Sequence, residues 1–92
     1  MHRMGRLRQQ LEQWLPEQFP QAEIRLDLAR RGQKIGGILA WDGLAGLEPI
    51  DRQGLLWRAL RARFDRDDQL GISSIITLTP AEYAVYREPQ IA

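Results

Sequence analysis

The stretch "AEIRLDLARRGQKIGGILAW", residues 22–41, decides the fold, because two strand patterns lie on either side of a turn signal. Its first half alternates apolar and charged residues, which predicts a strand from Ala22 to Arg30 with one buried and one wet face. A second strand is predicted from Lys34 to Trp41. The intervening "RRGQK" is typical of a turn in which Gly32 has a positive φ. The stretch therefore predicts a β-hairpin.

An amphipathic helix is predicted before the hairpin. Apolar residues recur there with the spacing i, i+4, i+7 and i+8, which places them on one helix face. They are Leu7, Leu11, Trp14 and Leu15. We expect this helix to run from Met4 to Leu15 and to end at Pro16, because proline lacks a backbone N–H group.

A second helix and a third strand are predicted after the hairpin. Pro49 is favoured in a first helical turn, and the helix is expected over residues 50–66, where "DRDDQ" ends it. The apolar run "ISSIITLT" predicts the third strand over residues 72–79. Thr79 and Glu82 then form a capping-box pattern around Pro80, which predicts a short helix to about Arg87.

The order of these elements is helix, strand, strand, helix, strand and short helix. An antiparallel hairpin with a third strand and helices on one face is an α+β two-layer sandwich, α-β-β-α-β-α. The 92 residues suffice for one small domain, so we expect a single domain over residues 1–92.

Two groups of glycines raise the question of phosphate binding. Gly36 and Gly37 lie inside a strand with no helix following, which indicates a bulge or a close backbone approach instead. Gly43 and Gly46 have the Gly-x-x-Gly spacing by which some folds clamp a nucleic-acid backbone. Nearby carboxylates repel phosphate, so we interpret the motif as a tight turn with Leu44 in the core. These carboxylates are Asp42, Glu48 and Asp51.

Composition excludes several kinds of chemistry. The 13 basic and 12 acidic residues leave a net charge of +1, which argues against bulk electrostatic attraction to nucleic acid. The absence of cysteine excludes disulfides, thiolate metal sites and a cysteine nucleophile, and the only histidine is His2. No apolar run approaches the length of a membrane span, and "MHRMGRLRQQ" lacks a signal-peptide core. We therefore expect a cytoplasmic protein without membrane contact.

The helix ending in "WLP", the hairpin, "WDGLAGLEPIDRQGLLWRAL" and "ISSIITLTPAEY" together resemble the BolA family. The resemblance implies an α+β fold akin to the type II KH domain. Leu44-x-Gly46 stands where the family has Phe-x-Gly, and Arg52 matches the arginine of an Arg-His pair at the head of the long helix. It further implies a protein-partner surface around Arg52, with a monothiol glutaredoxin as partner.

The family's histidines are missing from this chain. Gln53 stands in place of the histidine at the helix head, and Gly71 in place of an iron-ligating histidine before the third strand. The bridging two-iron two-sulfur cluster that BolA proteins share with monothiol glutaredoxins needs thiolate or imidazole ligands. We therefore expect neither cluster ligation nor another metal or cofactor in this chain.

Three functions remain open. We expect a non-catalytic protein-interaction or regulatory domain, because Ser73 and Ser74 have no histidine nearby to activate them. The alternatives are a KH-like domain that binds single-stranded nucleic acid and an iron–sulfur trafficking partner of a monothiol glutaredoxin. Trp41 and Trp57 would be anchor residues if they were exposed. The expected partner-binding residues are Gly43, Gly46, Arg52 and Gln53.

Overall fold

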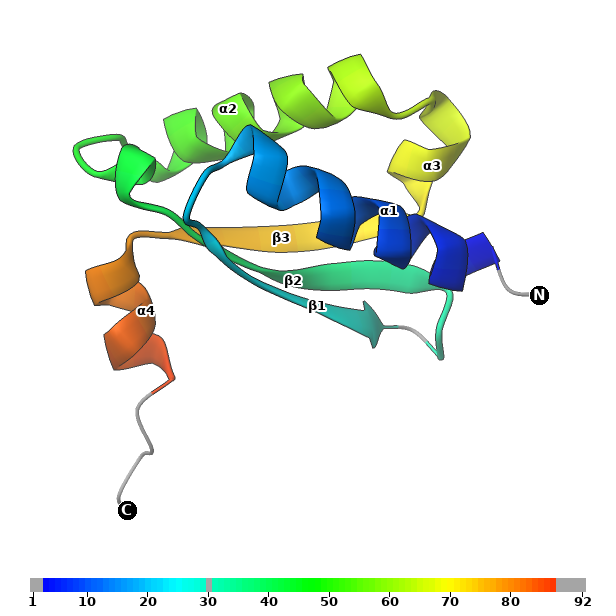
Figure 1. Ribbon diagram of the computed structural model, residues 1–92, viewed down its shortest axis with the longest axis horizontal. Coiled ribbons are helices and arrows are strands. Elements are labelled where there is room, and N and C mark those ends of the chain that lie inside the picture. Colours follow the sequence, from blue (N-terminus) through cyan, green and yellow to red (C-terminus); the bar gives the residue numbers. More distant parts are fainter. Residues whose placement is uncertain (1–2, 30, 88–92) are drawn as a thin grey trace.

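A computed structural model describes residues 3–29 and 31–87, and their elements follow the predicted order (Figure 1). The chain forms α1 (Arg3–Gln18), β1 (Glu23–Ala29), β2 (Lys34–Ala40), the 3-10 turn η1 (Asp42–Leu44), α2 (Pro49–Arg63), α3 (Arg66–Leu70), β3 (Ile72–Leu78) and α4 (Pro80–Tyr86). The α+β class and the α-β-β-α-β-α order are thus confirmed, with α3 as an additional short helix.

The three strands form one mixed sheet in the order β1-β2-β3. β1 and β2 pair antiparallel without interruption, from Glu23 opposite Ala40 to Ala29 opposite Lys34. β2 and β3 pair parallel, with a shift of register between Ile35 and Gly37. In the hairpin turn Gly32 has the predicted positive φ of 82°, whereas Arg30, the predicted end of the first strand, lies outside the described residues.

The hydrophobic core lies between one face of the sheet and the helices α1 and α2, which cover that face side by side (Figure 1). Buried residues come from α1, the three strands and α2. They include Leu7, Leu11, Leu15, Leu26, Ile35, Leu39, Leu56, Leu60 and Ile75. Helix α4 lies at one end of the sheet, on the side away from α1 and α2 (Figure 1). Among the described residues, therefore, no helix lies over most of the second face of the sheet.

The predicted end of the first helix was wrong, because α1 continues through Pro16 to Gln18. A proline in the last turn removes only its own hydrogen bond, and the turn closes regardless because Phe19 N donates to Leu15 O at 2.8 Å. Both Leu15 and Phe19 are buried, so packing of the last turn outweighs the missing bond.

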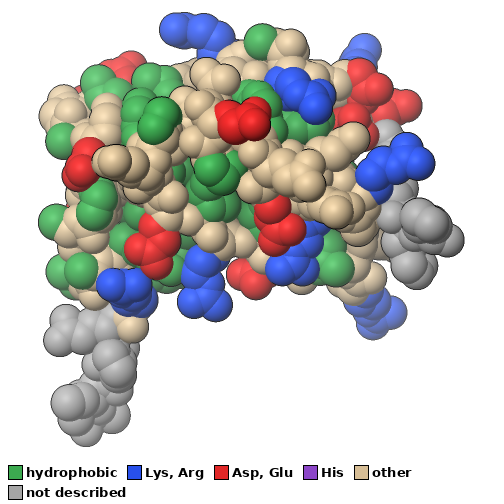
Figure 2. All heavy atoms as spheres, in the orientation of Figure 1, with side chains coloured by type: hydrophobic (Ala, Val, Ile, Leu, Met, Phe, Trp, Pro, Cys, Tyr) green, Lys and Arg blue, Asp and Glu red, His purple; other side chains and the backbone are tan. Residues whose placement is uncertain are grey.

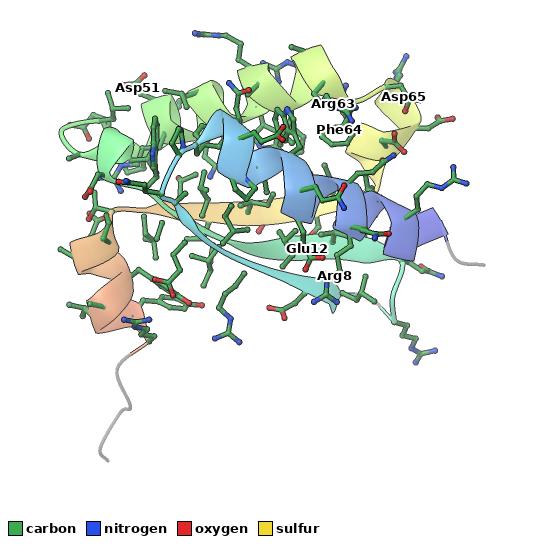
Figure 3. The ribbon with its side chains drawn as sticks, in the orientation of Figure 1. Arg8, Glu12, Asp51, Arg63, Phe64 and Asp65 are labelled. Atoms are coloured by element: carbon green, nitrogen blue, oxygen red, sulfur yellow. The ribbon has the colours of Figure 1, made fainter. Side chains whose placement is uncertain are left out.

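The segment "DRDDQ" contains a helix of its own, where only a helix-ending turn was predicted. α2 ends because Phe64 is extended, with φ −115° and ψ 146°, and buries its ring edge-on against Trp14 at 5.4 Å between centroids. Asp65 then caps α3 by accepting a hydrogen bond from Asp68 N at 2.8 Å. Figure 3 shows Phe64 and Asp65 at this junction, next to Arg63 at the end of α2.

At Gly37 the backbones of β1 and β2 lie close together, as the glycine pair Gly36–Gly37 indicated. A Cβ atom at this position would lie 2.0 Å from Arg25 O of β1, which is far inside contact distance. The irregularity in the β2–β3 pairing lies at the same place. Only glycine allows the three backbones to meet here.

Candidate interaction surface

Arg52 and Gln53, expected at a partner surface, make internal hydrogen bonds. Arg52 is only 11% exposed; its Nε donates to Leu47 O at 2.9 Å and its Nη1 to Glu82 Oε1 at 2.6 Å. Gln53 Nε2 donates to Ile75 O at 2.8 Å and to the Oγ1 of a neighbouring β3 residue, Thr77, at 3.1 Å. The head of α2 is therefore joined to β3 and α4 by side-chain bonds.

These bonds cap the outer edge of β3, where no other strand of the described residues lies. Leu78 O accepts from Trp41 N, so this carbonyl points toward β2. Carbonyls of successive residues in a strand point in opposite directions, so those of Ile75 and Thr77 point away from β2. Gln53 donates to the first at 2.8 Å, and Arg52 Nη1 lies 3.4 Å from the second. The helix head thus satisfies acceptors that a strand edge would otherwise present.

Glu82 completes this arrangement from α4. Its Oε1 accepts from Thr79 N at 2.8 Å and its backbone N–H donates to Thr79 Oγ1 at 3.2 Å, which confirms the predicted capping box. The hydrogen bond from Arg52, followed by that from the Thr79 backbone, lowers the pKa of the Glu82 carboxyl from 4.5 to about 2. The carboxylate therefore stays charged and joins α4 to the head of α2.

The Gly43–Gly46 loop is built as a turn around a buried leucine. Leu44 is fully buried, as predicted, within the 3-10 turn. A Cβ atom at Gly43 would lie 2.4 Å from ring carbons of Trp41, and Gly46 has a φ of 82°. The turn itself therefore explains why glycine occupies both positions: a side chain at Gly43 would clash, and Gly46 has a backbone conformation that favours glycine.

The two tryptophans, which would be anchor residues only if exposed, are half-buried. Trp41 Nε1 donates to Pro20 O at 2.9 Å, and its ring packs edge-on against Phe19 at 5.1 Å between centroids. Trp57 packs partly buried against the hydrophobic core. Both rings thus contribute to packing within the domain.

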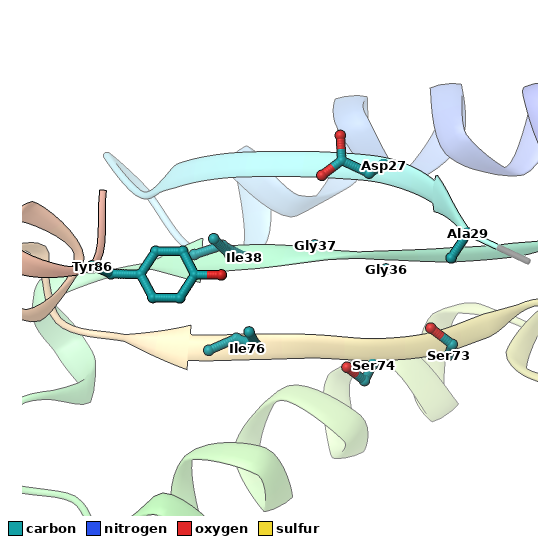
Figure 4. Close-up of a pocket in the computed structure, with 9 residues that line it drawn as sticks. All are labelled: Asp27, Ala29, Gly36, Gly37, Ile38, Ser73, Ser74, Ile76 and Tyr86. Atoms are coloured by element: carbon teal, nitrogen blue, oxygen red, sulfur yellow. The ribbon is translucent and has the colours of Figure 1, made fainter. Parts of the chain in front are cut away.

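The sequence did not indicate an open groove on the sheet face opposite the core (Figure 4). One part has a volume of about 290 Å³ and continues into a second of about 350 Å³ under α4. Asp27, Ile38 and Tyr86 line both parts. We call this feature the open-face groove, and its other lining residues are Arg25, Ala29, Gly36, Gly37, Ser73, Ser74, Ile76, Tyr83 and Arg87.

Apolar side chains are exposed within the groove. Ile76 is 41% and Tyr86 58% exposed, and Ile38 lies half-buried between them and β1. The strand patterns did contain a signal for this apolar strip, because Ile38 and Ile76 alternate with the core-facing residues of their strands and so fall on the opposite sheet face. It was not recognised because an isolated apolar residue on a wet face is common.

Charged side chains flank this apolar strip. Arg87 Nη1 pairs with Glu23 Oε2 at 3.1 Å, and its guanidinium lies 5.2 Å from the centroid of the Tyr83 ring. Arg25 and Asp27 are exposed on β1, and neither has a salt bridge or side-chain hydrogen bond with another residue of the described ranges. The groove therefore has an apolar middle and a rim with charges of both signs.

Within residues 3–29 and 31–87, no three His, Cys, Asp or Glu side chains are grouped closely enough to hold a metal ion. His2 lies outside these ranges. No helix in the described part of the chain combines the length and apolarity needed to cross a membrane. Searches against protein-family models, curated proteins and solved structures gave no match to this chain.

Proposed function

We propose that this chain is a non-catalytic, BolA-like protein-interaction domain that binds its partner in the open-face groove. The observation that carries the proposal is the exposure of Ile76 and Tyr86 on a sheet face that, among the described residues, only α4 covers, and only at one end. A small domain places apolar side chains in its core when it can, and exposed apolar residues gathered in one groove are typical of a binding site.

The composition of the groove favours a protein partner. Protein interfaces combine an apolar centre with a polar rim. Here Ile38, Ile76 and Tyr86 form the centre, while Arg25 and Asp27 lie on the rim. The floor is backbone at Gly36 and Gly37, so an incoming apolar side chain can approach the sheet closely. A nucleic-acid site would instead favour a consistent basic rim.

The head of α2 supports the groove in this proposal. Arg52 joins β3 to Glu82 of α4, which is the helix that carries Tyr86. Arg52, around which the BolA resemblance implied a partner surface, would then act by positioning α4. A monothiol glutaredoxin is the first partner to test on the strength of that resemblance, with iron omitted because the proposed contact needs no cluster.

The test compares capture of partners by three forms of the chain. Wild type, Ile76→Asp and Arg58→Asp are immobilised and exposed to nuclease-treated extract of the native cells, and purified monothiol glutaredoxin is titrated separately. Arg58 is exposed on α2, away from the groove, and serves as a control that introduces the same aspartate elsewhere on the surface. We expect wild type and Arg58→Asp to bind the same protein, and Ile76→Asp to bind it about tenfold more weakly or worse.

Two outcomes would contradict the proposal. Equal binding by Ile76→Asp and wild type would remove the groove from the interface. Binding that nuclease abolishes, and that weakens steeply with salt, would instead favour the nucleic-acid alternative.

A further inference from the structure

The two outer edges of the sheet differ. The edge of β3 is capped by Arg52 and Gln53, as described above. Within the described part of the chain, β1 has a neighbouring strand on one side only. It pairs with β2 along its seven residues without a bulge, and it contains neither proline nor lysine. Proline, bulges and charged side chains, lysine above all, are the usual devices that prevent a strand edge from pairing with another chain. β1 has no proline, lysine or bulge, and two of its charges on the open face, Arg25 and Asp27, are of opposite sign.

The backbone groups that β1 presents outward can be identified. Arg25 O occupies the place that a Cβ of Gly37 would take, so this carbonyl points toward β2. In an antiparallel strand the N–H and C=O of one residue point to the same side, and those of successive residues point to opposite sides. The outward groups are therefore those of Ile24, Leu26 and Leu28, and no side chain of the described residues forms a hydrogen bond with them.

The side chains of β1 are self-complementary about Leu26. If a second copy pairs antiparallel with Leu26 opposite Leu26 of the partner subunit, Arg25 faces Asp27 of the partner subunit, and Asp27 faces its Arg25. Both charges lack a salt-bridge partner within the described part of one copy. On the other sheet face, Ile24 meets Leu28 of the partner subunit. Leu28 is 46% exposed in one copy.

Other registers fit less well. A two-fold axis at Arg25 places two arginines opposite each other and sets Glu23 against Asp27 of the partner subunit. An axis at Asp27 opposes two aspartates. Like charges directly opposite each other are destabilising, and an axis at Ile24 leaves Asp27 beyond the paired segment. A shift by one residue turns apolar side chains to the charged face.

We propose that the chain forms a symmetric homodimer in which β1 pairs antiparallel with β1 of a second copy about Leu26. The two sheets become continuous, and the outward N–H and C=O groups of Ile24, Leu26 and Leu28 all gain partners. Glu23 falls opposite Ala29 of the partner subunit, so its pair with Arg87 is retained. Figure 2 shows acidic and basic side chains interspersed along the lower margin, the side on which β1 lies in Figure 1.

Sedimentation of the full chain from low to high micromolar concentration tests the dimer. One strand pair is a small interface, so wild type is expected to show a reversible, concentration-dependent monomer–dimer equilibrium. Arg25→Asp makes both facing pairs acidic, and Asp27→Arg makes both basic. Each variant is expected to raise the dimer dissociation constant by about tenfold or more, whereas Arg58→Asp leaves it unchanged.

Mixing the two charge variants gives the sharpest result. An equimolar mixture of Arg25→Asp and Asp27→Arg restores opposite charges at both positions, so the heterodimer is expected to form at the concentration where wild type dimerises. This restoration also shows that each variant is folded. Ile76→Asp, on the face of β3, is expected to dimerise like wild type, which separates this test from that of the groove.

Three results would overturn the homodimer. The first is a wild-type chain that stays monomeric over the whole concentration range. The second is a dimer as tight in either charge variant as in wild type, because its interface would then lie elsewhere. The third is a mixture of the two variants that stays monomeric while wild type dimerises.

Discussion

Gln53 and Arg52 show how a polar residue at a helix head can have an internal role. Their pattern and position resembled a partner surface, yet their side chains bond to Ile75 and Thr77 of β3. The acceptors lie more than twenty residues later in the sequence. Local pattern cannot show whether a donor is satisfied by so distant a carbonyl, so this role was not predictable, whereas the capping box of Thr79 and Glu82 was.

Removing the Gln53 amide leaves Ile75 O without its side-chain donor. We expect Gln53→Ala to lower the free energy of unfolding by about 1–3 kcal/mol, because an unsatisfied, part-buried acceptor loses its bond without regaining full hydration. Urea denaturation measures the change. Arg58→Ala, which alters an exposed side chain of the same helix, should stay within about 0.5 kcal/mol of wild type. A Gln53→Ala effect no larger than this control would refute the capping role.

Glu82 makes the stability of the folded domain depend on pH in the acid range. Its pKa is lowered to about 2 in the folded chain from an ordinary value of 4.5, so its contribution is fully present above pH 4.5 and is lost as the pH falls toward 2. We expect wild type to be more stable than Glu82→Gln above pH 4.5, with the difference shrinking between pH 4.5 and 2. Urea midpoints at a series of pH values measure it. A difference that is constant over this range would contradict the Arg52 pairing.

At the scale of elements, alternation and capping signals predicted the strands to within a residue or two and the start of α4. The errors were at the ends of α1 and α2 and at α3, where tertiary packing outweighs local preference. Pro16 remains helical because Leu15 and Phe19 are buried on either side of it, and α3 forms because burial of Phe64 redirects the chain. Neither burial is visible in the local sequence.

Two glycines provide a matched test of strand packing. Gly37→Ala places a methyl group 2.0 Å from Arg25 O, so we expect the β1–β2 pairing to weaken and stability to fall by about 3 kcal/mol or more. Gly54→Ala lies on α2 with no atom within 4 Å and should raise stability by about 1 kcal/mol. Thermal and urea unfolding measure both. If Gly37→Ala were tolerated as well as Gly54→Ala, the close approach would not exist.

At the scale of the whole molecule, the two-layer class was predictable because each element carries its own periodicity. The open-face groove was not, because it depends on strand order and on the side of the sheet where α4 lies. Ile38, Ile76 and Tyr86 come from three separate elements, and only the fold brings them together. The same holds for the contrast between the capped edge of β3 and the open edge of β1.

The most direct test of the central claim, that a protein docks on the open face of the sheet, is photo-crosslinking in the native cell. A benzophenone amino acid replaces Ile76 in one version of the chain and Arg58 in another, and adducts are identified by mass spectrometry. We expect a protein adduct from position 76 that unlabelled wild type suppresses, and none from position 58. Adducts from position 58 alone, or nucleic acid as the species captured at position 76, would contradict it.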